Sequence, residues 1–224
     1  MSRDQSAGQA GSQGDAPDEL LEDFVDDIPI GRALDLGMGD GKSAVWLAER
    51  GFDVIGVDLS ATAVQAAQRL ARERGVVLET HVADISEWEI EPDRYALVLA
   101  SAVLHFLLPE EIRGLANRIR AGLQSGGYLI AQVFTVDDPG YQVLRQQGAS
   151  LVAERTFFVS DIGGPLHYFD FGELRSLFKE LEILYYAEER HLDSSSPDDP
   201  HYRAGAFLVA RKGGQKGSRD EHPE

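Results

Sequence analysis

The chain has 224 residues, 43% of them hydrophobic, which is enough for one substantial core. The formal net charge is −17 and no cluster of lysine and arginine forms a basic face, so we expect a protein that binds neither nucleic acid nor membrane. Cysteine is absent, which excludes disulfides, and no apolar run approaches the length of a membrane span. The first residues lack the pattern of a signal peptide, and we expect a cytoplasmic protein.

The N-terminal segment predicts a tail followed by a helix. Residues 1–16 lack hydrophobic periodicity and predict a disordered tail. Residues 17–28 place apolar side chains on one helical face and acids on the other. The apolar positions are Leu20, Leu21, Phe24, Val25 and Ile28. We expect this helix to pack on the edge of a sheet, or else to cover a ligand site.

The most informative segment is a tight turn with three alternating glycines, Gly37, Gly39 and Gly41. It follows an apolar strand expected over 32–36, which carries Asp35. A helix expected over 42–50 begins directly after the turn. Glycines at alternate positions let a ligand approach the backbone more closely than a Cβ would allow. The ligand would then lie against the N-terminus of the helix.

A second strand, expected over 53–57, is followed by Asp58, where an acid suits ribose hydroxyls, so the two strands together predict a nucleoside pocket. A phosphate-binding P-loop needs four residues between its glycines, whereas this turn offers three and would place Asp40 against the phosphates. A dinucleotide fingerprint fits residues 39–44 but leaves Gly37 unexplained and puts acids beside a pyrophosphate. S-adenosylmethionine carries a sulfonium cation and no phosphate, which suits these acids.

Strands alternate with helices along the chain, which is typical of a parallel sheet. Strands are expected over 32–36, 53–57, 76–82, 95–100 and 127–134, and helices over 42–50, 60–74, 109–123 and from about 172. Two last strands, 183–190 and 204–211, have no helix between them and predict an antiparallel hairpin. The pattern predicts an α/β protein with a seven-stranded, mostly parallel sheet between two helix layers.

Residues 137–168 are too long for a tight crossover and follow a central strand, at the edge where ligands bind in open α/β sheets. We expect a weak helix to about Gln147 and then a substrate lid. Its aromatic residues either wall the substrate or pack the insert on the sheet: Phe157, Phe158, Tyr168 and Phe169. The whole of 17–212 is expected to be one domain, followed by a mobile tail over 213–224.

These motifs resemble the class I S-adenosylmethionine-dependent methyltransferases, through Asp35-x-Gly37-x-Gly39-x-Gly41, Asp58 and Asp84 after three successive strands. Within that superfamily, the chain resembles the tellurite-resistance methyltransferases. The segments that carry this narrower resemblance are Leu34-Asp-Leu-Gly, Trp46–Val54, Ser101–Leu107, Gly126-Gly-Tyr, Phe171-Gly-Glu-Leu and Phe207–Lys212. The resemblance covers about 30–212 and implies a Rossmann-like methyltransferase fold with S-adenosyl-L-methionine as cofactor. It also implies a small-molecule acceptor.

The resemblance assigns roles to the residues at the strand ends. Asp35 would contact the amino group of the cofactor, directly or through water. Asp58 would take both ribose hydroxyls, since a carboxylate can accept two hydrogen bonds side by side. Asp84 would hold the adenine, and Ser101 would face the sulfonium. The full set of expected cofactor residues is Asp35, Gly37, Gly39, Gly41, Asp58, Leu59, Asp84, Ile85 and Ser101.

The candidate catalytic residues are His105, His191, His201 and Arg203. His105 is either a base or a packed wall residue, because its neighbours are apolar. The tellurite-resistance relatives carry a histidine and an arginine near the start of the final hairpin, which matches His191, or His201, with Arg203. Such a pair would orient a small anion, although a solvated loop is an equally good interpretation. His167 belongs to the same wall in this interpretation, and the histidine spacing indicates no metal site.

The sequence therefore predicts in-line methyl transfer from S-adenosylmethionine to a small molecule, such as a chalcogen oxyanion or another soft nucleophile. An oxygen or nitrogen acceptor would favour a histidine as base, whereas a soft anion needs none. Two alternatives stay open. One is a protein that binds S-adenosylmethionine without turnover, and the other is a nicotinamide-dependent oxidoreductase. A monomer or a homodimer fits the sequence equally well.

Overall fold

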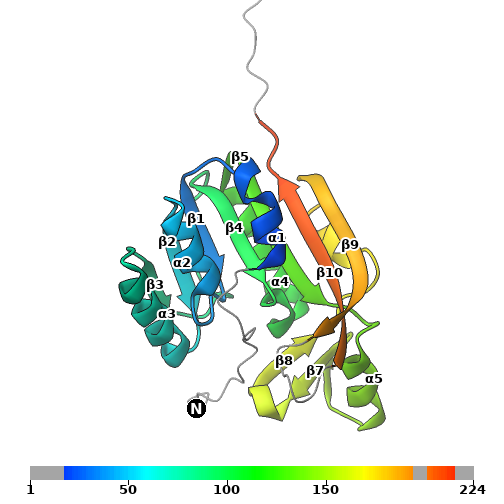
Figure 1. Cartoon of the computed structure of the whole chain (residues 1–224). Helices are drawn as coiled ribbons and strands as arrows, with labels where there is room; N and C mark the ends of the chain where they lie inside the picture. The colour runs from blue at the N-terminus through cyan, green and yellow to red at the C-terminus, as the bar shows by residue number, and fades with distance from the viewer. Residues whose placement is uncertain (1–17, 194–200, 215–224) are drawn as a thin grey trace, which may run out of the picture.

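The computed structural model describes residues 18–193 and 201–214. They form a seven-stranded sheet (Figure 1). In spatial order its strands are β3 (Glu79–Val82), β2 (Asp53–Asp58), β1 (Arg32–Leu36), β4 (Tyr95–Ser101), β5 (Leu123–Phe134), β10 (His201–Arg211) and β9 (Glu182–Asp193). The first five run parallel, and β10 is antiparallel to both β5 and β9. The predicted Rossmann-like sheet with a C-terminal antiparallel hairpin is confirmed.

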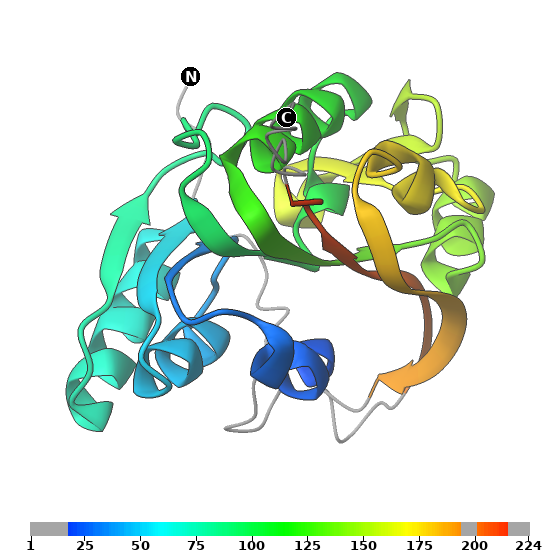
Figure 2. The ribbon, with the colours of Figure 1, turned by 90° about the horizontal axis from the view of Figure 1, so that it is seen from above.

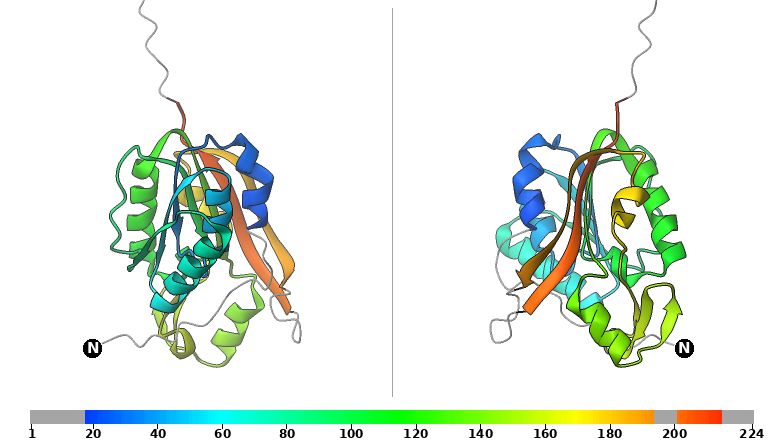
Figure 3. Two further views of the ribbon diagram at one scale, coloured as in Figure 1. Left: turned by 60° about the vertical axis from the view of Figure 1, so that its left-hand side comes forward. Right: turned by 90° about the vertical axis from the view of Figure 1, so that its right-hand side faces the viewer.

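Helices cover both faces of the sheet (Figure 2). Three lie on one face, namely α1 (Glu19–Phe24), α2 (Lys42–Glu49) and α3 (Ala61–Arg74), and α1 continues as the short 3-10 helix η1 (Val25–Asp27). On the opposite face lie α4 (Pro109–Gly122) and α6 (Glu173–Leu177), as Figure 3 shows. The three-layer arrangement follows from one apolar stripe on each helix, since each stripe needs an apolar sheet face to cover it.

The sequence signals at the helix ends act as expected. Ser60 caps α3, where its Oγ accepts a hydrogen bond from Ala63 N at 3.3 Å, and Gly75 ends that helix with φ 70°. In α4, Pro109 occupies the first position and the Glu111 carboxylate accepts from Leu108 N at 2.8 Å. These caps satisfy backbone groups that a helix end leaves without partners.

The two faces of the sheet bury separate apolar clusters. The face under α4 and α6 holds Leu34, Leu36, Val98, Ile112, Leu115 and Phe178. The face under α1 and α2 holds Leu21, Ala33, Leu47, Leu97 and Ile130. Strand β4 is buried along its first six residues, which fits its position at the centre of the sheet.

The insert after β5 has a sheet of its own, which the sequence analysis did not predict. It contains α5 (Pro139–Gln146), followed by the antiparallel strands β6 (Leu151–Ala153), β7 (Thr156–Val159) and β8 (Gly164–His167), with the 3-10 helix η3 (Ser160–Ile162) in the last turn. A turn through Arg155, at φ 53°, joins β6 to β7. The insert lies at the carboxyl edge of the parallel strands, at the bottom of Figure 1.

Several boundaries differ from the expected ones. The third strand begins at Glu79 and not at 76, because its ladder with β2 begins where Ile55 pairs with Glu79. Strand β5 begins at Leu123, since pairing with Tyr95 extends it across a bulge. The tail predicted over 1–16, and residues 215–224 of the tail predicted over 213–224, lie outside the described residues. Within the described part of the chain, none of the helices has the length and apolar character that crossing a membrane requires.

Candidate cofactor and acceptor site

The glycine turn between β1 and α2 is left-handed at all three glycines, with φ of 73°, 57° and 83° at Gly37, Gly39 and Gly41. A Cβ at Gly37 would lie 2.4 Å from a methyl of Val103, and a Cβ at Gly41 would lie 2.5 Å from Ala67 Cβ. A Cβ at Gly39 would meet no protein atom within 4 Å. Packing therefore requires glycine at 37 and 41, whereas at 39 the backbone faces open space, where a ligand can approach it closely.

Asp58 joins the glycine turn to the loop after β2. One of its carboxylate oxygens accepts a hydrogen bond from Gly39 N at 2.9 Å, and the other accepts from Ser60 N at 2.8 Å. Each oxygen keeps a further lone pair, which suits the two neighbouring hydroxyls of a ribose. Leu59 follows directly and is 57% exposed. The structure thus brings Asp58, Leu59 and Gly39 together.

Asp35 is a buried carboxylate at the carboxyl end of β1 and is only 4% exposed. Among the described residues, no hydrogen-bond donor or cation pairs with it. Burial, together with the negative charges of Asp18 and Asp58, raises the pKa of Asp35 to about 8. A cationic ligand beside Asp35 would offset both effects.

In the loop after β3, Asp84 makes a polar contact within the turn, whereas Ile85 packs in the core. Asp84 is half-buried and accepts a hydrogen bond from Ser86 N at 2.9 Å, so it shapes the turn. Ile85 is 6% exposed and packs in the apolar cluster under α4. The guanidinium of Arg118 reaches from α4 to the carbonyl oxygens of Ile85 and Ser86, at 3.3 and 2.6 Å. Arg118 thereby fixes the loop that the resemblance assigns to the adenine.

Ser101 ends β4 and contacts two residues that the sequence analysis did not select. Its hydroxyl donates to the carboxylate of Asp18, at the start of α1, and lies 3.4 Å from Gln132 Oε1 on β5. Ala102 follows with φ 53°, which is strained for a residue with a Cβ. The parallel register of β4 and β5 pairs Ser101 with Gln132, but no local pattern in the sequence indicates the contact with Asp18.

His105 lies in the short 3-10 helix η2 (Leu104–Phe106) and is 1% exposed. Its Nδ1 accepts a hydrogen bond from Phe134 N at 3.4 Å, so the proton is on Nε2, and its ring stacks on Phe134 at 4.2 Å. Burial, with smaller contributions from Arg203 and His167, lowers the pKa of His105 to about 3. The neutral imidazole therefore has no free lone pair with which to accept a proton as a base. The geometry favours the interpretation of His105 as a packed wall residue.

Arg203 on β10 shares the surroundings of Phe134. Its guanidinium carbon lies 5.2 Å from the centre of the Phe134 ring, and Nη1 lies 3.7 Å from Oδ1 of the buried Asp138. Asp138 also accepts from Gly140 N and Ala204 N, so it attaches the start of the insert to β10. The strand register pairs Arg203 with His191. The side chains of His191 and His201 lie outside the described residues.

Most aromatic residues of the insert pack it on the sheet. Phe157 and Phe169 are each 1% exposed, and Tyr168 is 2% exposed, with its ring 6.3 Å from that of Phe157. Phe158 is half exposed. The ring of Tyr168 stacks on that of Phe134 at 6.5 Å, and Phe134 also lies against His105 and Arg203.

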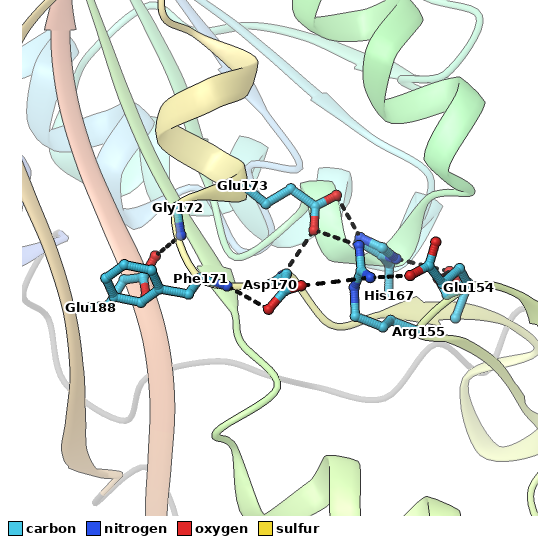
Figure 4. Close-up of polar contacts among 9 residues, drawn as sticks. Glu154, Arg155, His167, Asp170, Phe171, Gly172, Glu173 and Glu188 are labelled. Atoms are coloured by element: carbon cyan, nitrogen blue, oxygen red, sulfur yellow. Dashed lines mark hydrogen bonds and ion pairs between the residues drawn. The ribbon is translucent and has the colours of Figure 1, made fainter.

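His167 belongs to a charged cluster between the insert and α6 (Figure 4). Its Nδ1 lies 2.8 Å from Thr156 Oγ1, and its Nε2 lies 3.4 Å from the Glu173 carboxylate. Arg155 pairs with the same carboxylate at 3.0 Å and lies 3.8 Å from Asp170. Burial raises the pKa of Glu173, but the contacts with His167 and Asp170 N and the charge of Arg155 outweigh it and lower that pKa to about 2. Arg155 thus joins the carboxylates of Glu154, Asp170 and Glu173, and these contacts hold the insert against α6.

The edge of the sheet fits S-adenosylmethionine on its donor chemistry. Asp58 offers acceptors for ribose hydroxyls, Asp35 is a buried carboxyl group that a neighbouring positive charge would ionise, and Gly39 leaves room at the backbone. A pyrophosphate would meet two carboxylates at the same place. The geometry therefore favours a cationic nucleoside over a dinucleotide.

Comparisons with known proteins agree with this geometry. Residues 33–127 match the family model described as a methyltransferase domain. The chain is 30% identical over 168 residues to the 2-heptyl-1-hydroxyquinolin-4(1H)-one methyltransferase of Mycobacteroides abscessus, covering 74% of this chain and 65% of the relative. It is 25% identical over 108 residues to the probable S-adenosyl-L-methionine-dependent methyltransferase TehB of Haemophilus influenzae, covering 48% of this chain and 37% of the relative.

The crystal structure of TehB from Haemophilus influenzae superposes with a TM-score of 0.69 at 21% identity, over 88% of this chain and 63% of that one. This match shows a common fold, whereas the chain spans less than two thirds of either curated relative. S-adenosylmethionine is the expected cofactor, and the description of the TehB relative names it. Residues 33–127 thus match a methyltransferase domain, and the chain is similar in sequence and fold to S-adenosylmethionine-dependent methyltransferases, TehB among them.

Proposed function

We propose that the protein transfers a methyl group from S-adenosylmethionine to a small molecule by in-line displacement at carbon. The observation that carries this proposal is the pair of carboxylates around the glycine turn. Asp58 holds both loops through backbone N–H groups, and Asp35 is buried beside it without a cation among the described residues. The bound cofactor supplies a methyl group on a sulfonium, which is already a good leaving group. The protein then has mainly to align the reactants and exclude water.

We place the acceptor between the end of β4, the end of β5 and the insert, with residues 137–168 as its cover. Arg203 offers a partly exposed guanidinium there, held by Asp138 and lying over Phe134. A guanidinium suits an acceptor that carries an anionic oxygen. His105 does not offer a base, because its Nδ1 already accepts a hydrogen bond. These features support a small anion that needs no deprotonation, such as a chalcogen oxyanion or an ionised N-hydroxy heterocycle.

The test is a turnover assay with the full chain, S-adenosylmethionine and a panel of acceptors. The panel holds tellurite, selenite, a 1-hydroxyquinolin-4-one and trans-aconitate, and the product measured is S-adenosylhomocysteine. We expect product with at least one anionic acceptor. We also expect Arg203→Lys to raise the KM of that acceptor while calorimetric affinity for S-adenosylhomocysteine stays within twofold. A wild-type protein that binds neither S-adenosylmethionine nor S-adenosylhomocysteine would overturn the proposal.

A second candidate is a protein that binds S-adenosylmethionine without turnover. The observation in its favour is that His105 is neutral and buried, which leaves no base for a protonated acceptor among the described candidates. Cofactor binding without product across the panel, with anionic and protonated acceptors alike, would favour this reading.

A further inference from the structure

We propose that Asp18 is a further cofactor-binding residue, whose carboxylate shares with Asp35 the positively charged methionine end of S-adenosylmethionine. The inference rests on the proposed function and adds a residue from outside the strand-end motifs. It makes the segment that begins α1 part of the cofactor site. The amphipathic pattern of that segment predicts mainly packing on the sheet edge.

Hydrogen bonds place Asp18 over the carboxyl edge of the sheet. Its carboxylate accepts the hydroxyl of Ser101 at the end of β4, and its backbone N donates to Ser43 Oγ at 3.2 Å, in the first turn of α2. Ser101 and Ser43 flank the glycine turn from two sides, because β4 and α2 adjoin β1 there. Asp18 therefore lies beside the turn, 83 residues from Ser101 in sequence.

The helix that follows holds Asp18 in this position. The carboxylate of Asp18 caps α1 by accepting from Leu21 N at 3.3 Å. Leu21 is fully buried, and Val25 and Ile28 are buried in the same apolar cluster as Leu47 and Leu97. Burying these side chains fixes the helix on the sheet. The carboxylate of Asp18 is therefore preorganised at the strand end and loses little conformational entropy when a ligand binds.

The charges around Asp18 point to a cationic ligand. Asp18 and Asp58 both act on Asp35 through their negative charges, and Asp35 is buried and has no hydrogen-bond or ion-pair partner among the described residues. No described lysine, arginine or histidine forms an ion pair with Asp18 either. Burial and the charges of Asp18 and Asp58 disfavour the ionised form of Asp35, and a ligand with an ammonium group and a sulfonium would relieve that repulsion. Asp58 already serves the ribose in the proposed site, which leaves Asp18 and Asp35 for the cationic end.

The test compares Asp18→Asn with Asp23→Asn by calorimetry with S-adenosylhomocysteine and S-adenosylmethionine. Asparagine caps helices as well as aspartate, so the first variant keeps the start of α1 and removes only the charge. Asp23 is an exposed acid on the same helix and controls for the field of the acidic protein. We expect Asp18→Asn to weaken binding about tenfold and Asp23→Asn to leave it within twofold. Equal affinity in wild type and Asp18→Asn, or equal losses in both variants, would overturn the inference.

A second readout does not depend on the ligand. Carboxyl NMR titration of the unliganded protein reports the pKa of Asp35, which we expect to fall in Asp18→Asn because one repelling charge is gone. An unchanged pKa of Asp35 would contradict the juxtaposition on which the inference rests. If the wild-type protein binds neither cofactor form, the proposed function fails. If wild type binds and Asp18→Asn binds equally well, only the role of Asp18 fails.

Discussion

The glycine turn and the contact between the insert and α6 differ in whether their acidic side chains have cationic partners. At the turn, Asp35 is buried beside Asp18 and Asp58, and among the described residues no cation joins them. Between the insert and α6, the carboxylate of Glu173 lies within reach of both Arg155 and His167 (Figure 4). Leaving a buried charge without a partner costs folding free energy, whereas a closed charge cluster holds elements together. We infer from this difference that the turn binds a ligand and that the cluster supports the fold.

The largest effect is expected at Asp58. Asp58→Ala removes the acceptor for Gly39 N and Ser60 N as well as the acceptors for the ribose. We expect affinity for S-adenosylhomocysteine to fall about 100-fold, since hydrogen bonds to charged groups contribute about 1.5–3 kcal/mol. Calorimetry measures it, with the nearby exposed acid in Asp40→Asn as control. Unchanged affinity in Asp58→Ala would show that the glycine turn is not part of the cofactor site.

Substitution of Asp35 is expected to change cofactor affinity and folding stability in opposite directions. Asp35→Asn is expected to weaken cofactor binding about tenfold yet to raise the free energy of unfolding of the unliganded protein by about 1–3 kcal/mol at neutral pH. The folded-state pKa of about 8 exceeds the unfolded value near 3.8, so the wild type loses stability as pH rises from about 4 to 8. Urea unfolding at pH 4, 6 and 8 measures this. The stability gap between variant and wild type should widen with pH, and a constant gap would contradict the burial argument.

The sequence predicts the meeting of the strand-end acids at the glycine turn, but it does not predict the contact that Asp18 makes there. The strand-end acids Asp35 and Asp58 stand at fixed positions in a repeating strand-helix pattern, so their meeting at one edge follows from a parallel sheet. Periodicity also predicted α4 and the final hairpin. Asp18 comes from a segment whose only local signal was amphipathicity, and its contact with Ser101 depends on where α1 docks.

The insert was the hardest part to predict for a related reason. Its strands have three or four residues each, which is too short for a clear alternation of apolar and polar residues. The charged cluster of Arg155, His167 and Glu173 joins residues up to 18 positions apart. Nothing in their spacing indicates that they pair, since their meeting depends on how the hairpin packs against α6.

Disrupting the charged cluster should lower folding stability in a pH-dependent way and leave cofactor affinity unchanged. Glu173→Gln removes the anion that Arg155 and His167 share, and we expect a loss of about 1–2 kcal/mol at pH 7, limited by the partial exposure of Glu173. The lowered pKa of about 2 means that the wild type keeps this stability above about pH 4.5 and loses it as pH falls towards 2. Thermal unfolding from pH 7 to 3 measures the difference, which should shrink with acid. A large loss of S-adenosylhomocysteine binding in this variant would break the contrast between the two regions.

The smallest and most closely matched test replaces one glycine in each region. Gly39 and Gly163 have φ of 57° and 65°, and an added Cβ would meet nothing within 4 Å at either position. Gly39→Ala and Gly163→Ala should therefore cost the same folding free energy, about 1 kcal/mol, because only the left-handed backbone opposes alanine. If the cofactor lies against Gly39, its variant alone loses affinity for S-adenosylhomocysteine, by about threefold to tenfold. Equal stability losses with equal affinities would show that the space in front of Gly39 is not where the cofactor binds, whereas a loss confined to Gly39→Ala would assign that space to the cofactor independently of any charge.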